Sequence, residues 1–515
     1  MSHRPRSRWL AISPGLVAWA GLVLPAPLLA QQSSAQDQLP EMGTAAQSTL
    51  SIEDEYRVGR MVMRGLRESG QVVDDPEINE YMQSLGLRLS SLAHDGNRQF
   101  NYFLVRDPAI NAFALPGGFI GIHSGLLMET ANESELAGVL AHEISHVTQR
   151  HIARRLESQS RTNLVSAAAM LAAILLGSVA GGGGNTTMGA ISAVQGLAAQ
   201  SQINFTRENE YEADRVGIGI LAAAGFDPNA MPSFFDTMGR RTQLGPSGLP
   251  ELLRTHPVTS ARIAESKGRA SQYPAFTVEE SLTYTLMKER VRVMTTPAGV
   301  DARDYYASTI TNEADASVAQ VYGRALAQVM SGDAAAAIPT LERLRTSRPD
   351  VLQFHTALGQ AQLAAGDVRG SLATLDKARQ LAPRNVPVTV RYADALMRAG
   401  RPKRAHEVLL DLFNNVPPSQ DQIRQTAMAA NAAGDVADAY SYMAEYHLMS
   451  ADLPLAINQL ELALSVPNIT QVQRQRFSAR LDELREALPK ERERLARPAQ
   501  DPESGGRPNL VDASW

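Results

Sequence analysis

The sequence of 515 residues contains no cysteine, and only 5% of its residues are aromatic. Without cysteine the protein holds no disulfide bond and uses no thiol in catalysis, which suits an exported protein, although this absence decides little by itself. Positive charge is not in excess, because 49 lysines and arginines against 54 acidic residues give a net charge of −5. This balance argues against a nucleic-acid-binding surface. The length allows two or three domains with full cores.

Residues 1–30 have the order of segments that is typical of a secretory signal peptide. Three arginines precede an apolar run over residues 9–24 and the segment P-A-P-L-L-A, so we expect cleavage after Ala30. An uncleaved anchor is the alternative, because Leu28 is a weaker match than alanine three residues before the cleavage point. The mature chain would carry a net charge of 46 − 54 = −8, so attraction to anionic lipid is not expected to localise it.

Residues 132–155 show the pattern of a half-buried helix. Asn132 or Ser134 can cap its N-terminus. Its apolar residues recur at spacings of three and four, and they are Leu136, Val139, Leu140, Ile144 and Val147.

This helix carries the sequence H-E-I-S-H. His142 and His146 are four residues apart and therefore project from one helix face, where two imidazole nitrogens can reach one metal ion. Glu143 stands beside them, where a carboxylate can take a proton from an attacking water and return it to the leaving amine. A helix with two histidines and one glutamate by chance is the alternative interpretation.

A catalytic zinc needs a third protein ligand, and residues 204–217 form an acidic segment with a helical pattern that can supply it. Glu210 and Asp214 are four residues apart, so one can bind the metal while the other accepts the N–H of a liganding histidine. From the spacing alone Glu208, Glu210 and Glu212 are interchangeable.

Four motifs together resemble one family. The segments N-A-F-A-L-P-G-G, H-E-I-S-H, E-Y-E-A-D and T-H-P-V-T-S-A-R are similar to those of the gluzincin metallopeptidases related to HtpX and the CAAX-prenyl proteases, in a form joined to tetratricopeptide repeats. The resemblance implies one Zn²⁺ per chain, held by His142, His146 and Glu210. It makes Glu143 the general base and Asp214 the residue that orients a liganding histidine, and it leaves Glu208 and Glu212 as surface charges.

The same resemblance gives His256 a role that its sequence context does not, since a histidine before a proline usually lies in a loop. His256 is expected to return to the active site, either as a fourth ligand in a latent form or to stabilise the transition state, with Arg262 helping to hold it. Residues 101–126 have β character, and an edge strand there could hold an extended substrate. The resemblance implies that Asn111 and residues 112–114 face the substrate, whereas a plain core hairpin is the alternative.

Residues 162–206 contain no charged side chain. Their alanine-rich and glycine-rich run of 17 residues, 164–180, is at the lower limit for a membrane span. We therefore expect an apolar helical hairpin that is buried or covers the active site as a lid. A hairpin that dips into a membrane is the alternative.

Beyond residue 310 the sequence is periodic. Gly332, Gly366, Gly400 and Gly434 follow one another at intervals of 34 residues, which is typical of paired helices in tetratricopeptide repeats. The predicted fold is mainly α (α+β), a zincin-type domain with a small β-sheet followed by an all-α solenoid. The predicted segments are a signal peptide (1–30), a flexible leader (31–50), the protease domain (51–270), a connector (271–310), the repeats (311–488) and a mobile tail (489–515).

The sequence therefore predicts an exported zinc endopeptidase with an additional chaperone activity. By resemblance we expect it in the periplasm, acting on the assembly and quality control of outer-membrane β-barrel proteins, with the barrel assembly machinery and stalled barrel proteins as partners. A repeat-based chaperone or adaptor with a latent or structural metal site is the alternative. A membrane-embedded protease has too few long apolar runs to be favoured.

Overall fold

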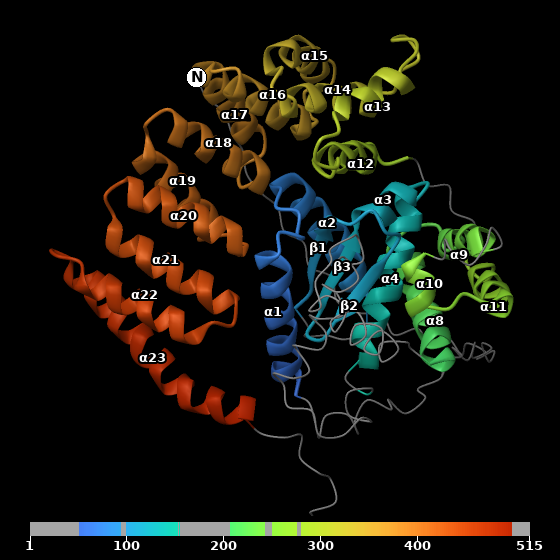
Figure 1. The fold of residues 1–515 in the computed structure, drawn as a ribbon, viewed down its shortest axis with the longest axis horizontal. Helices are drawn as coiled ribbons and strands as arrows, with labels where there is room; N and C mark the ends of the chain where they lie inside the picture. The colour runs from blue at the N-terminus through green and yellow to red at the C-terminus, as the bar shows by residue number, and fades with distance from the viewer. Residues whose placement is uncertain are drawn as a thin grey trace, which may run out of the picture. The chain divides into compact units, whose positions relative to one another are not determined.

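A computed structural model of the protein describes residues 51–93, 99–152, 154, 206–242, 250–274 and 280–496. Over these residues the chain is mainly helical with one three-stranded sheet (Figure 1), which confirms the predicted fold class. No helix among them is both long and apolar enough to span a bilayer. The predicted signal peptide, the leader, residues 162–205 of the expected hairpin and residues 497–515 of the expected tail lie outside the described ranges.

Two helices open the described chain. They are α1 (Ile52–Glu68) and α2 (Pro76–Ser90). The side chains of Ser51 and Asp75 cap them by accepting a backbone N–H of the first turn. α2 packs against β1 and against the helix that carries H-E-I-S-H.

The sheet contains β1 (Asn101–Val105), β2 (Ala112–Leu115) and β3 (Phe119–His123) in the order β1-β3-β2. β3 pairs in parallel with β1 and antiparallel with β2. Gly117 and Gly118 turn the chain between β2 and β3 at φ values of 79° and 84°, which side chains with a Cβ rarely adopt. β2 is therefore an edge strand, since within the described residues it pairs only with β3.

The helix with H-E-I-S-H is α4 (Glu133–Thr148), which follows the short α3 (Ser124–Glu129). Asn132 caps α4, and all five apolar residues of the predicted pattern are buried. α8 (Arg207–Ala223) packs along α4. The two helices approach closely at Gly217, where an added Cβ would lie 3.2 Å from the carbonyl oxygen of Ala141. This close packing brings the start of α8 to the histidines of α4.

Five further helices complete the part of the structure before the repeats. They are α9 (Ala230–Thr242), α10 (Glu251–Thr255), α11 (Ser260–Ala270), α12 (Leu282–Met294) and α13 (Ala302–Thr309). α11 packs on α8 and α9, and α12 packs on both α2 and the first repeat helix.

The repeats are antiparallel helices in sequence, each packed on the next. They are α14 (Val318–Met330), α15 (Ala334–Ser347), α16 (Leu352–Ala364), α17 (Val368–Leu381), α18 (Val386–Arg398), α19 (Pro402–Phe413), α20 (Gln420–Ala432), α21 (Val436–Met449), α22 (Leu453–Ser465) and α23 (Gln471–Ala496). All four periodic glycines have φ between 68° and 91°, and Asn468, 468 − 434 = 34 residues after the last, has φ 63°. A left-handed residue therefore marks the turn within each pair. α23 extends to Ala496, so its last turns fall in the range where the sequence predicted a tail.

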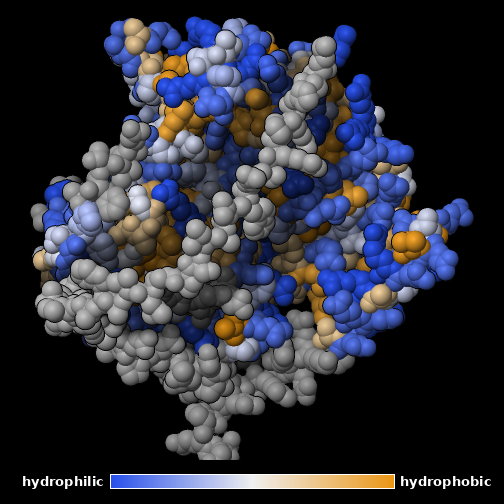
Figure 2. Space-filling view, turned by 180° about the vertical axis from the view of Figure 1, so that it is seen from behind, coloured by the Kyte–Doolittle hydropathy of each residue, from blue (hydrophilic) through white to orange (hydrophobic). Residues whose placement is uncertain are grey.

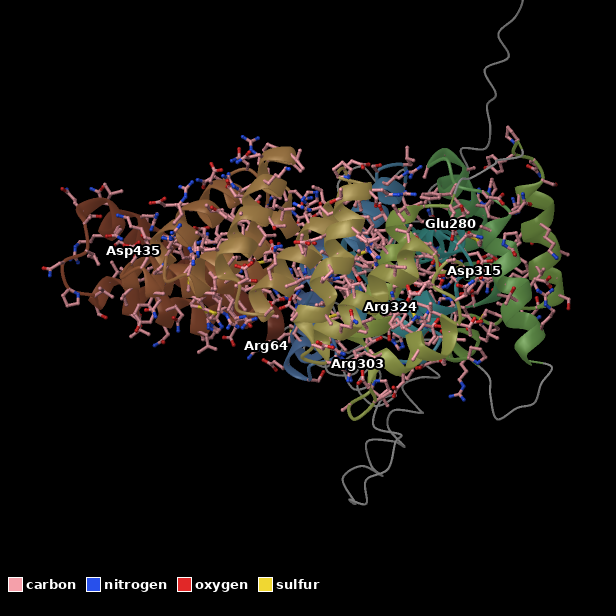
Figure 3. The ribbon with its side chains drawn as sticks, turned by 90° about the horizontal axis from the view of Figure 1, so that it is seen from above. Arg64, Glu280, Arg303, Asp315, Arg324 and Asp435 are labelled. Carbon is pink, nitrogen blue, oxygen red and sulfur yellow. The ribbon has the colours of Figure 1, made fainter. Side chains whose placement is uncertain are left out.

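The repeats contact α1 and α2 through ion pairs. Arg64 of α1, labelled in Figure 3, donates from Nη1 to Asp452 Oδ2 at 2.6 Å. Arg391 of α18 donates from Nη2 to Glu77 Oε2 of α2, also at 2.6 Å. On the face in Figure 2, hydrophilic residues cover most of the described surface, and hydrophobic residues form small separate areas.

Candidate metal centre

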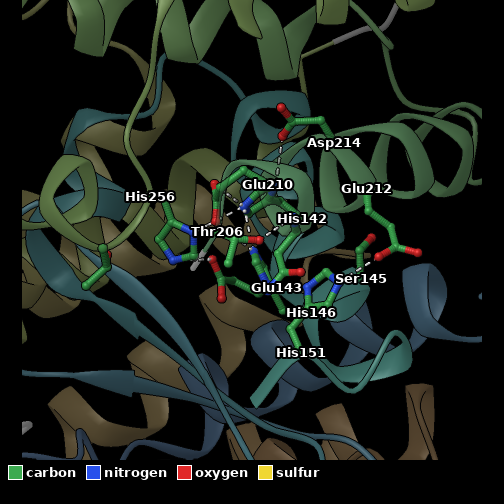
Figure 4. A network of polar contacts seen from close by, with 12 residues as sticks. His142, Glu143, Ser145, His146, His151, Thr206, Glu210, Glu212, Asp214 and His256 are labelled. Atoms are coloured by element: carbon green, nitrogen blue, oxygen red, sulfur yellow. Dashed lines mark hydrogen bonds and ion pairs between the residues drawn. The ribbon is translucent and has the colours of Figure 1, made fainter. Parts of the chain in front are cut away.

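Four side chains from three segments meet in the core. They are His142 and His146 of α4, Glu210 of α8, and His256 at the end of α10 (Figure 4). Each residue is at most 3% exposed, and one ligand atom from each lies within 4.8 Å of the others. Glu210 thus points toward the two imidazoles of α4.

The distances between these atoms fit one tetrahedral metal ion. His142 Nε2 lies 3.0 Å from His146 Nε2 and 3.3 Å from His256 Nδ1. Glu210 Oε1 lies 2.9 Å from His256 Nδ1 and 3.4 Å from His146 Nε2. Ligands held about 2.0–2.1 Å from a tetrahedral zinc are separated by about 3.3 Å. The donor atoms are therefore already spaced as a metal would hold them.

The charges around the site also fit a divalent cation. Three carboxylates are at most 2% exposed, those of Glu143, Glu210 and Asp214, and Arg262 is the buried cation among them. Histidine binds a metal in its neutral form, and with the imidazoles in that form the group carries a charge of 1 − 3 = −2. Buried charges require compensation, and a dication would balance this group.

The Glu143 carboxylate lies where a catalytic base would be needed. It is fully buried, and neither oxygen has a hydrogen-bond partner among the described residues. His256 Nε2 is 3.6 Å from its Oε1. A buried carboxylate without a hydrogen bond is costly, so this position fits a group that hydrogen bonds to a water molecule.

Asp214 and Arg262 contact the candidate ligands His142 and Glu210 through the second polar atom of each side chain. Asp214 Oδ1 lies 2.9 Å from His142 Nδ1. Arg262 donates to both Asp214 oxygens, at 2.5 and 2.7 Å, and its Nη1 lies 2.5 Å from Glu210 Oε2. Arg262 was predicted to hold His256, but besides the two carboxylates it contacts His142 Nε2 at 3.5 Å and, near the loop of His256, donates to the carbonyl of Pro257 at 3.3 Å.

The pKa values of these groups reflect the same arrangement. Burial alone would lower the pKa of His142, but Asp214 and Glu210 raise it to about 9. Burial would raise the pKa of Glu210, yet His256, Arg262 and the α4 histidines hold it well below its ordinary value. The pKa of Asp214 is lowered in the same way by Arg262 and His142, against the effect of burial. Both carboxylates are therefore ionised, and the site favours a positive charge.

The segment before β2 lies next to α10. The carbonyl of Ile110 accepts the backbone N–H of Leu252 at 3.1 Å. Asn111 is 4% exposed, and its Oδ1 has no partner among the described residues. An amide oxygen thus stands available at the start of the edge strand.

Residues 76–270 match Peptidase family M48, and residues 362–430 match a tetratricopeptide repeat family. The chain is 35% identical over 463 residues to the putative β-barrel assembly-enhancing protease of Vibrio cholerae serotype O1, over 89% of this chain and 94% of that protein. The chain belongs to the family of the β-barrel assembly-enhancing proteases. The member from Escherichia coli strain K12 is also 35% identical, over 87% of this chain and 92% of the relative.

The chain is thus a metalloendopeptidase with tetratricopeptide repeats, as its motifs predicted. Its protease part is also similar to the mitochondrial metalloendopeptidase OMA1 of Arabidopsis thaliana, with 32% identity over 187 residues, which cover 36% of this chain and 35% of the relative.

Two residues near the ligands were not predicted to take part. Glu212 was interpreted as a surface charge, but its side chain is only 31% exposed and its Oε2 lies 3.0 Å from His151 Nε2. This hydrogen bond lowers the pKa of Glu212 to about 2. The second residue is His151. It is a third histidine, five residues after His146, and helical spacing alone does not place it near the candidate ligands.

Proposed function

We propose that this protein is a zinc-dependent endopeptidase of the periplasm that assists the assembly and quality control of outer-membrane β-barrel proteins. The tetrahedral spacing of His142, His146 and Glu210 beside the unpartnered Glu143 carboxylate carries the proposal. Two imidazoles and one carboxylate suit zinc. The periplasm and the barrel substrates rest on the resemblance of the motifs and on the names of the relatives.

The proposed roles follow from position. His142, His146 and Glu210 would hold the zinc, which when bound would polarise a peptide carbonyl and make water more acidic. Glu143 takes the proton of the attacking water and passes it to the leaving amine. Asp214 fixes the ring of His142 through Nδ1. Arg262 holds Asp214 and Glu210 in place.

The edge strand β2 is the proposed place for the substrate. A peptide that adds to β2 would be held extended by backbone hydrogen bonds. Asn111, whose amide oxygen has no hydrogen-bond partner among the described residues, precedes this strand, and α4 packs against the same strand. An extended chain along β2 would therefore pass beside the catalytic helix.

His256 supports a latent resting state. Its Nδ1 takes the fourth corner of the ligand group, 2.9 Å from Glu210 Oε1 and 3.3 Å from His142 Nε2. With that corner filled, the attacking water has no place, so the loop of residues 256–259 must move before hydrolysis. This position also favours the second candidate function, a repeat-based chaperone or adaptor whose metal site stays latent.

The substitution Glu143→Gln distinguishes the two functions, because it keeps every proposed ligand and removes the base. We expect zinc content equal to that of wild type by elemental analysis. Cleavage of an unfolded outer-membrane barrel protein should fall by about 10²–10⁴-fold, both in the wild-type chain and in a His256→Ala background. Glu208→Gln, an exposed change on α8, is the control. If Glu143→Gln leaves cleavage intact, the enzyme proposal fails, and unchanged assembly in cells would support the adaptor.

A further inference from the structure

A chain of hydrogen bonds leads from the metal centre to the rim of the protease core. His146 Nδ1 lies 2.8 Å from His151 Nδ1, and His151 Nε2 lies 3.0 Å from Glu212 Oε2. Arg154 Nη2 donates to the same carboxylate oxygen at 3.2 Å. Figure 4 shows His151 beside His146, with Glu212 on the neighbouring helix. His151 is fully buried, and each of its ring nitrogens has a protein partner.

The backbone turns sharply to place His151 there. In a continuous helix, residues five positions apart lie about 140° apart around the axis, so His151 could not face His146. α4 ends at Thr148, and Arg150 has φ 53°, which is uncommon for a residue with a Cβ. The buried Arg150 side chain donates from Nε to Glu55 Oε1 at 2.8 Å, which anchors this turn on α1.

The direction of the hydrogen bonds follows from the metal site. If Nε2 of His146 binds the metal through its lone pair, its proton must be on Nδ1. That N–H donates to Nδ1 of His151, whose own proton is then on Nε2 and is donated to Glu212. Each nitrogen and oxygen in this series of hydrogen bonds can therefore act either as donor or as acceptor without conflict. A carboxylate at the far end polarises both rings toward the metal.

The two α4 histidines are thus supported differently. His142 faces the carboxylate of Asp214 directly at 2.9 Å. On the Nδ1 side of His146 the carboxylate of Glu212 is reached through a second imidazole, that of His151. Partners of this kind orient a ligand and raise its basicity.

We propose that His151 and Glu212 are positioning residues of the metal centre, which fix the tautomer and orientation of His146 through an imidazole relay. The inference rests on the proposed function, because it requires His146 to be a zinc ligand. Glu212, rather than Asp214, is then the carboxylate that serves this second histidine.

The test measures the zinc dissociation constant of the metal-free full chain by competition with a chromophoric chelator. We expect His151→Phe, which keeps a ring but offers no acceptor, to raise this constant by about 10–100-fold. His151→Gln, whose amide oxygen can accept from His146, should restore part of the affinity. Glu212→Gln should raise the constant, whereas the control Glu208→Gln on the same helix should not. The cobalt(II) absorption spectrum of His151→Phe should also differ from that of wild type.

Thermal unfolding of each metal-free variant separates a metal effect from a loss of stability. If His151→Phe does not fold, Glu212→Gln decides the question. Dissociation constants within about threefold of wild type for Glu212→Gln and for any folded His151→Phe would overturn the relay while leaving the proposed function intact. A wild-type chain that binds no zinc would instead overturn both.

Discussion

Arg290 of α12 is predicted to be a strong determinant of stability at the junction of the protease part and the repeats. It is 2% exposed. Its Nε and Nη2 each donate to Asp75 at 2.7 Å, and Nη2 also donates to Glu77 at 3.0 Å. Asp75 caps α2, which packs on α4. Arg290 therefore holds the start of a helix that supports the helix with the proposed metal ligands.

The substitution Arg290→Met keeps an unbranched apolar stem, removes the guanidinium and leaves two buried carboxylates with less compensation. Breaking a buried ion pair by removing one partner costs about 3–5 kcal/mol. Arg391 still contacts both carboxylates, at 2.8 and 2.6 Å, so we expect about 3 kcal/mol, the lower end of that range. Arg292→Met is the control on the same helix. Its partly exposed pair with Glu289 should be worth less than about 1 kcal/mol.

The loss of stability in Arg290→Met should depend on pH. Burial alone would raise the pKa of Asp75, but Arg290 and Arg391 hold it well below its ordinary value. In the wild type the ionised Asp75 therefore stabilises the fold at pH values above its unfolded pKa of about 3.9. This stabilisation is lost as the pH falls through the lower pKa that Asp75 has in the folded protein. In Arg290→Met the pKa of Asp75 rises, so the carboxyl gains a proton at a higher pH. The stability difference should be largest near neutral pH and should narrow toward about pH 5.

Urea unfolding followed by circular dichroism measures the loss, and hydrogen exchange of residues 76–90 assigns it to α2. Adding Asp75→Asn and Glu77→Gln to Arg290→Met should recover much of the stability, because no unpaired buried charge remains. If Arg290→Met costs no more than Arg292→Met, or if the difference widens on acidification, the reasoning about buried charge is refuted.

Three further outcomes are expected. Glu210→Ala should lose zinc relative to wild type in elemental analysis, and equal zinc in both would mean that the third ligand is wrong. His256→Ala should keep zinc and cleave an unfolded barrel protein faster, because the fourth corner is free; an unchanged rate would contradict the latent state. Gly86→Ala should lower the thermal midpoint at a cost of about 1–3 kcal/mol, because its Cβ would lie 2.3 Å from the Tyr102 ring; an unchanged midpoint would show that the ring can move.

The sequence predicted local structure well where one periodicity dominates. The spacing of three and four gave α4, and the 34-residue interval gave the turns at Gly332 and its successors. The turn at Asn468 was not predicted, because the pattern was read from glycines and asparagine can also take the left-handed conformation. The pairing of β1 with β3 rather than β2 was not predictable from alternation, since alternation shows which face of a strand is buried and not its neighbour.

The candidate site was predictable only in part. His142 and His146 follow from helical spacing, but spacing could not choose Glu210 over Glu208 or Glu212, and the choice came from the family resemblance. The closeness of His256 to Glu210 depends on the tertiary fold, since the two residues are 46 positions apart in the sequence. His151 could not be placed, because its position depends on the left-handed turn at Arg150.

The side of β2 that pairs with no described strand has a consequence for the proposed binding of substrates. A strand edge recognises main chain, so almost any residue order can add to it, provided that the incoming segment is still unpaired. A completed barrel has no such segment, because closure joins its first strand to its last. A barrel that has not closed retains one. Selection would then depend on whether closure has occurred, so that a finished barrel is spared without carrying any protective signal.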